Sequence, residues 1–256
     1  MAVRLIDTHC HLNFPPLRQN IATLIEQAHS NGVVGFVVPA TNSSDWKELL
    51  GLSEKYPEIM HVALGVHPCF ISQESLSNDL LSDQLQALSK HFIAIGECGL
   101  DARFDNLEQQ LNIFEMQLEL AGKLDKPVIM HSVRRHQEVL DLVKKCGLHW
   151  GVVHAFSGSY EQAKQFVDQG LHLGVGGVIK RNKGKTYDAF KRMPVDALLI
   201  ETDSPDMYLP GNPERQGSPL DILEILSELS EMKQLDKESL ADVLQNNCQK
   251  LFFSSR

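Results

Sequence analysis

Eight short apolar runs recur along this chain, each separated from the next by a segment long enough to form a helix. The runs are nearly continuous and rich in aliphatic and β-branched residues, which is typical of parallel strands covered on both faces. Strands that alternate with helices predict a parallel sheet joined by right-handed crossovers. The runs are AVRLI (2–6), VVGFVV (33–38), IMHVALGV (59–66), FIAIG (92–96), PVIM (127–130), GVVHAF (151–156), LHLGVGG (171–177) and ALLIE (197–201).

The segments between the runs carry apolar residues at helical spacing. Dividing 256 residues by eight gives 32 residues per unit, which suits a βα repeat. We therefore expect an α/β fold, a (β/α)8 TIM barrel that forms one domain over residues 1–256. An open doubly wound sheet is the rival fold, but it usually has a glycine-rich loop after its first strand, where this chain reads DTHCHLNF. The helical segments fall at 21–30, 44–56, 79–90, 107–124, 136–146, 160–169, 183–192, 218–231 and 236–252.

Histidines and carboxylates follow most of these runs, and catalytic groups of an α/β barrel sit at the carboxyl ends of its strands. In an extended chain His9 and His11 would share one face, with Cys10 turned away. A lone histidine is a metal ligand only about one time in ten, but several strands that deliver such groups to one rim predict a metal site. These ligand types suit zinc, manganese or iron, and carboxylates with water also hold magnesium. The residues are Asp7, His9 and His11, then His67, then Glu97 and Asp101, then His131, then His154, and last Glu201, Asp203 and Asp206.

The segments DTHCHLNF, GVHP, AIGECGLD, PVIMHS, VVHAFSG and LLIETDSPD resemble, in order, the signature segments of the TatD-type metal-dependent deoxyribonucleases of the amidohydrolase superfamily. The resemblance covers about residues 5–210, and TDSPDM is similar to the YjjV-type subgroup. It implies a barrel with two or three divalent metal ions, Zn, Mg or Mn. Residue by residue it implies metal ligands at His9, His11, Glu97, His131, His154 and Asp203, catalytic roles for Glu97 and Asp203, and a substrate-phosphate contact at His67.

The groups themselves suggest a mechanism. Two metal ions about 3.5–4 Å apart can share one water molecule and lower its pKa, so that hydroxide attacks phosphorus. Asp203 can accept the proton, since a carboxylate beside a cation stays ionised. Asp7 is interpreted as a residue that orients a ligand, and the role of Glu201 stays open.

A formal net charge of −9 excludes a protein that coats nucleic acid by general charge attraction. Positive charge would instead be local, from the metals and from the segment IKRNKGK (179–185), where Lys180 and Arg181 are candidate substrate-binding residues. A solvated loop explains this segment equally well. Arg134 and Arg135 open a helix and are expected to be solvated.

The expected function is a metal-dependent hydrolase of ester bonds, a phosphodiesterase or deoxyribonuclease that binds DNA or another phosphoester transiently. An amidohydrolase acting on a C–N or lactone bond is the alternative; many of these bridge their metals with a carboxylated lysine, where this chain has Glu97. A metal-binding scaffold without activity is the third hypothesis. Many relatives have an Arg-Asn-x-Pro segment after strand eight, and this chain departs from it at 211–222, which puts the substrate range in doubt.

Five scattered cysteines without a CxxC pair indicate reduced thiols and a cytoplasmic protein. The sequence shows no secretory signal and no apolar run of membrane-spanning length. It predicts no obligate protein partner.

Overall fold

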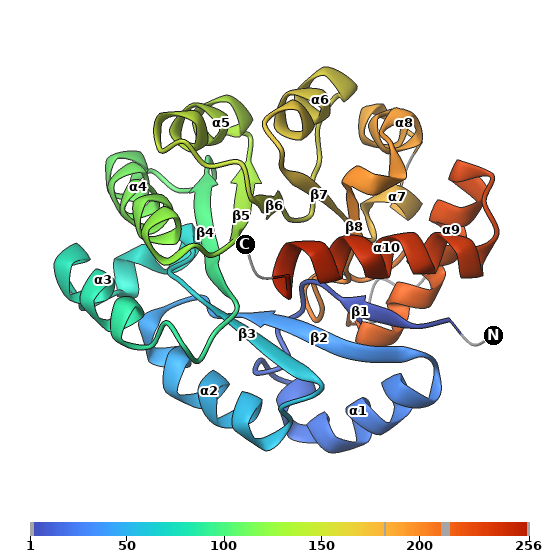
Figure 1. The fold of residues 1–256 in the computed structure, drawn as a ribbon, viewed down its shortest axis with the longest axis horizontal. Coiled ribbons are helices and arrows are strands. Elements are labelled where there is room, and N and C mark those ends of the chain that lie inside the picture. The colour runs from blue at the N-terminus through green and yellow to red at the C-terminus, as the bar shows by residue number, and fades with distance from the viewer. Residues whose placement is uncertain (1–2, 182, 211–215, 255–256) are drawn as a thin grey trace.

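The computed structural model describes residues 3–181, 183–210 and 216–254. Eight parallel strands form one sheet in the order β1 to β8, so each strand pairs with its neighbour in sequence. Helices surround this sheet on the outside, and Figure 1 shows the ring they form. The strands are β1 (Leu5–Asp7), β2 (Val33–Pro39), β3 (Met60–Leu64), β4 (Ala94–Asp101), β5 (Val128–Val133), β6 (Gly151–Val153), β7 (His172–Val175) and β8 (Leu198–Ile200).

Polar contacts between the first and last strands bring the sheet into a nearly closed barrel. The backbone N–H and the hydroxyl of Thr8 both donate to the carbonyl of Ile200, at 3.1 and 2.9 Å. The backbone N–H of Thr202 donates to the carboxylate of Asp7 at 3.0 Å, and the Thr202 hydroxyl donates to the same carboxylate. The chain therefore folds as the expected (β/α)8 barrel.

The barrel interior is a small apolar core to which seven strands each contribute one residue: Ile6, Val37, Ala63, Ala94, Ile129, Val152 and Leu199. The last helix, α10 (Lys237–Phe252), packs Cys248, Leu251 and Phe252 against this core. Because Ala94 begins β4, this core lies toward the amino ends of the strands. Figure 1 shows α10 crossing the barrel mouth at that end. The opposite mouth, at the carboxyl ends, remains for function.

In the described part of the chain, nine further α-helices lie between or after the strands. None of the helices in the described ranges is both long and apolar enough to cross a membrane. Their bounds are α1 (Ile21–Ser30), α2 (Trp46–Lys55), α3 (Asn78–Ala87), α4 (Leu107–Leu124), α5 (His136–Lys145), α6 (Tyr160–Asp168), α7 (Val178–Arg181), α8 (Lys185–Arg192) and α9 (Ile222–Lys233).

Most predicted elements differ from the structure in their bounds; the run 151–156, for example, forms β6 only over Gly151–Val153. The fourth strand was expected at 92–96, but β4 continues to Asp101, whose backbone N–H donates to the Gln110 side chain at 2.7 Å. The helix expected at 183–192 is preceded by the one-turn helix α7. The helix expected at 218–231 begins only at Ile222, because Ser218 caps a 3-10 turn over Pro219–Asp221. Local hydrogen bonds, which hydrophobic spacing does not reveal, act at the end of β4 and before the start of α9.

Candidate metal centre

The two histidines that follow β1 converge. Their Nε2 atoms lie 3.3 Å apart, although β1 ends before both of them. The backbone N–H of Asp203 donates to the carbonyl of His9 at 2.8 Å. The backbone N–H of His11 donates to the carbonyl of Ser204 at 2.7 Å. The chain after β8 therefore holds the histidine pair in place, and a continued strand is not needed.

A second pair of histidines comes from β5 and from the end of β6. His131 lies within β5, and His154 follows β6 directly. The Nδ1 atom of His131 and the Nε2 atom of His154 lie 3.2 Å apart. The rings of His154 and His9 are stacked, with centroids 3.9 Å apart, so the two pairs are neighbours.

The carboxylate of Glu97 lies between the two pairs. Its Oε1 atom is 2.9 Å from Nδ1 of His131 and 2.7 Å from Nε2 of His154. Its Oε2 atom is 3.2 Å from Nε2 of His9 and 3.6 Å from Nε2 of His11. Each oxygen thus faces a different histidine pair, which is the arrangement of a carboxylate that bridges two ions.

The donor atoms fit divalent metal ions. Two nitrogens on one zinc ion, each about 2.0–2.1 Å from it in tetrahedral geometry, lie about 3.3 Å apart. The two pairs show 3.3 and 3.2 Å. Burial alone would raise the pKa of Glu97, but the surrounding histidines overcome this and hold it well below its usual value. A buried, ionised carboxylate among imidazole nitrogens favours a cation at this point.

Asp203 completes the first pair and faces the open side of the site. Its Oδ1 atom lies 3.5 Å from Nε2 of His9 and 3.6 Å from Nε2 of His11. Its side chain is 14% exposed, whereas that of Glu97 is 2% exposed. Burial acts to raise the pKa of Asp203, but the hydrogen bond with His11 and the nearby histidines lower it. Asp203 is therefore the ionised carboxylate that an incoming molecule can reach.

Asp101 supports His131 from behind. Its Oδ2 atom lies 2.9 Å from Nε2 of His131, and Nε of Arg103 donates to both carboxylate oxygens at 3.0 Å. A carboxylate on one ring nitrogen keeps the proton there and leaves the other nitrogen free to bind a metal. The sequence placed Asp101 at a strand end but gave no signal for this role.

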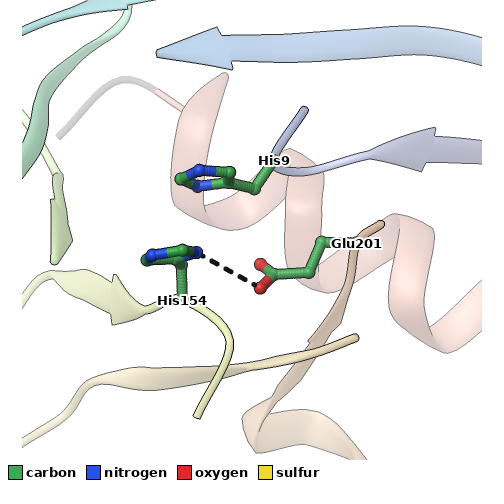
Figure 2. Close-up of side chains that lie close together, drawn as sticks. All are labelled: His9, His154 and Glu201. Atoms are coloured by element: carbon green, nitrogen blue, oxygen red, sulfur yellow. Dashed lines mark ion pairs between the residues drawn. The ribbon is translucent and has the colours of Figure 1, made fainter. Parts of the chain in front are cut away.

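Glu201, whose role the sequence left open, lies at ion-pair distance from His154, but Nδ1 of His154 makes no hydrogen bond within the described residues. Figure 2 shows its carboxylate beside the stacked rings of His9 and His154. Oε1 lies 3.7 Å from Nδ1 of His154 and accepts a hydrogen bond from the backbone N–H of Ala155. Burial would lower the pKa of His154, but Glu97 and Glu201 raise it well above its usual value. Nε2 of His154 thus faces Glu97, while Nδ1 faces Glu201.

His67 is a hydrogen-bond donor. Its Nδ1 atom accepts a bond from the backbone N–H of Cys69 at 3.0 Å, so the ring hydrogen sits on Nε2. That Nε2 lies 3.2 Å from Oε1 of Glu97. Burial lowers the pKa of His67 to about 4, and the ring is neutral near neutral pH. A nitrogen that carries hydrogen cannot bind a metal, which favours the expected contact with substrate.

The basic segment 179–185 does not form a single cluster. Arg181 lines the cavity of about 630 Å³ that opens over the centre. Lys180 instead pairs with Glu224 at 2.8 Å and does not line that cavity. Lys183 lies over the ring of Tyr187, 5.6 Å from its centroid. Of the two residues predicted to bind substrate, Arg181 lines the cavity and Lys180 does not, so the contact with phosphate stays a prediction for Arg181.

The altered segment 211–222 is described only from residue 216 onward, and residues 211–215 lie outside the described ranges. Gly217 donates a backbone hydrogen bond to Pro205 at 3.0 Å. A Cβ atom there would lie 2.9 Å from the carbonyl oxygen of Met207. Because Met207 lines the cavity, glycine at this point lets the segment pack directly against the wall of the site.

Comparisons with known proteins show which family the chain belongs to. The family described as TatD related DNase matches residues 6–253. The chain is 37% identical over 257 residues to the uncharacterized metal-dependent hydrolase YjjV of Escherichia coli, covering 98% of this chain and 99% of that protein. It is 31% identical to the 3'-5' ssDNA/RNA exonuclease TatD of Erwinia tasmaniensis, with 97% and 99% covered. The crystal structure of the Escherichia coli YjjV, a TatD homologue, superposes with a TM-score of 0.93 at 36% identity over the full length of both chains. The chain therefore belongs to the TatD-related DNase family.

Proposed function

We propose that this protein is a phosphodiesterase that hydrolyses DNA with two divalent metal ions. The observation that carries the proposal is Glu97, whose two oxygens face two separate histidine pairs. The first ion would be held by His9, His11 and Asp203, and the second by His131 and His154, with Glu97 shared between them. Relatives named as deoxyribonuclease and as ssDNA/RNA exonuclease support a nucleic-acid substrate.

Different residues of the chain have different roles in the proposed hydrolysis. Bound divalent ions supply Lewis acidity and lower the pKa of a water molecule. Asp203, ionised and open to the cavity, accepts the proton of the attacking water. His67 lines the cavity beside Glu97, where its ring can contact the substrate, and Arg181 on the cavity wall attracts the substrate phosphate. Asp101 holds the ring of His131 through its 2.9 Å contact with Nε2, and Glu201 places a second carboxylate 3.7 Å from Nδ1 of His154.

A substrate panel with metal-reconstituted protein tests this function. A chelator should abolish cleavage of single-stranded DNA, and we expect addition of zinc, manganese or magnesium to restore it. Duplex DNA, RNA, a phosphomonoester, a lactone and a dipeptide complete the panel. Hydrolysis of the lactone or the dipeptide without cleavage of any phosphodiester would refute the proposal and favour an amidohydrolase.

Gly174→Ala should weaken metal binding although no ligand changes. A Cβ atom at position 174 would lie 2.3 Å from Oε2 of Glu201, so that carboxylate must move away from His154. Loss of a carboxylate that supports a ligand histidine typically costs about 10–100-fold in metal affinity. Competition with a chromophoric chelator measures this loss.

Gly51→Ala is the matched control for that experiment. Gly51 lies on α2, and a Cβ atom there would meet no other atom within 4 Å. Circular dichroism of both variants checks that each one folds. Equal metal affinity in folded Gly174→Ala and in the wild type would show that Glu201 does not position His154.

A further inference from the structure

A second cavity, of about 440 Å³, adjoins the cavity over the metal centre. Val133 and Ser157 line both of them, so a chain-like substrate could extend from one into the other. The second cavity is bounded by the segment after β5 and by the first turns of α5, α6 and α8. It therefore lies on the same face of the barrel as the metal centre.

Two cationic side chains line this second cavity. Arg134 and Lys185 are both exposed, and within the described part of the chain neither makes an ion pair. Glu138 is the acidic residue of the lining, and it is neutralised by Arg135 at 2.7 Å. The cavity is thus locally positive in a chain whose net charge is −9. Such a local excess attracts an anionic group.

The backbone around the cavity adds to this preference. Arg134 has a φ of 55°, the left-handed conformation that is uncommon for a residue with a side chain and that is often kept at functional sites. The helices α5 and α8 both begin at the cavity, and their amino ends carry partial positive charge.

The wall between the two cavities is fixed by a buried histidine. Nδ1 of His136 accepts a hydrogen bond from the hydroxyl of Ser132 at 2.6 Å. Its Nε2–H donates to the carbonyl of Ser157 at 3.1 Å. Burial lowers the pKa of His136, so the ring is neutral and its two hydrogen bonds link Ser132 to Ser157. The passage at Ser157 is therefore held in one place relative to the metal centre.

We propose that this second cavity binds a neighbouring phosphate of the same polynucleotide, through Arg134 and Lys185, while another phosphodiester is cleaved at the metal centre. The inference rests on the proposed function and goes further, because it makes a nucleic-acid chain the preferred substrate over an isolated diester. Arg134 was expected to be solvated, and Lys185 belongs to the segment 179–185, which was expected to be either a local source of positive charge or a solvated loop. The fold separates Lys185 from Lys180 and brings it to the same cavity as Arg134.

The double variant R134Q/K185Q tests this, with single-stranded DNA of about 12 nucleotides and the p-nitrophenyl ester of thymidine 5'-phosphate as substrates. Each lost contact to a single-strand phosphate reduces the slope of log kcat/KM against log salt by about 0.7. Two contacts correspond to about 25-fold at 0.1 M salt relative to 1 M. We expect kcat/KM for the DNA to fall by about this factor at 0.1 M salt, while the value for the ester stays within about twofold.

R4Q/K250Q is the matched control. Arg4 and Lys250 are exposed at the opposite end of the barrel, and their substitution removes the same two positive charges. Anisotropy with an uncleaved phosphorothioate oligonucleotide should show the same loss of affinity for R134Q/K185Q alone. Equal effects on both substrates, unchanged DNA cleavage, or an equal loss in the control would each overturn the inference. The inference would also be overturned if inorganic phosphate inhibited ester cleavage by the wild type but not by R134Q/K185Q. That result would mark the second cavity as a site for the free phosphate ion. A wild-type protein that binds the oligonucleotide through these residues but cleaves no phosphodiester would refute the proposed function instead.

Discussion

Glu97→Gln should abolish both activity and the paired metal site. The amide keeps the shape of the side chain but replaces one anionic oxygen, and each oxygen of Glu97 faces a different histidine pair. We expect kcat/KM for DNA to fall by about 10³-fold or more, equal to about 4 kcal/mol of transition-state stabilisation. Elemental analysis of the dialysed variant should find less than the wild-type metal content.

Thermal unfolding gives a readout of the same variant that does not depend on activity. An ion present at about 100 times its Kd stabilises the folded state by about 2.7 kcal/mol. For a chain of this length that corresponds to a Tm shift of roughly 5–10 °C. A chelator should lower the Tm of the wild type by this amount and leave that of Glu97→Gln nearly unchanged. A variant that keeps the full metal content and the chelator-sensitive Tm would show that Glu97 does not bridge the ions.

The residues on the rim of the barrel could be predicted from the sequence, because the order of the strands determines which residues lie there. Parallel strands that close in sequence order bring their carboxyl ends to one mouth, so residues as distant as His11 and His154 had to meet there once eight strands were recognised. Even the error in the extent of β4 did not move Glu97 away from the site. Position along the chain is enough to place a residue on this rim.

The direction in which each side chain points could not be predicted in the same way. Single carboxylate oxygens of Asp101 and Glu201 face His131 and His154, at 2.9 and 3.7 Å, and residue spacing does not encode such directions. The basic segment 179–185 shows the same limit. In the one-turn helix α7 each residue is rotated by about 100° from the one before, so Lys180 and Arg181 point to different neighbours although they are adjacent in sequence.

Asp203→Asn separates turnover from metal binding. Its carboxylate is open to the cavity and lies 3.5 and 3.6 Å from the first histidine pair, so it can both help to hold an ion and take a proton from water. The amide can still contact a cation through its oxygen but cannot accept the proton. General-base removal typically costs about 10²–10⁴-fold, and we expect this loss in kcat with KM changed by less than about threefold.

Metal content distinguishes the two carboxylates. Asp203→Asn should keep its second ion, since His131, His154 and Glu97 are unchanged, and elemental analysis should find at least one ion per chain. Glu97→Gln loses a ligand to both ions, and its metal content should be lower. The conservative variant Asp203→Glu keeps the basic group and should recover part of the lost kcat. If Asp203→Asn raised KM and left kcat unchanged, the carboxylate would contribute to substrate binding, and the proton would have to leave through another group. The buried position of Glu97, 2% exposed beneath the cavity, leaves that carboxylate poorly placed to take over the role.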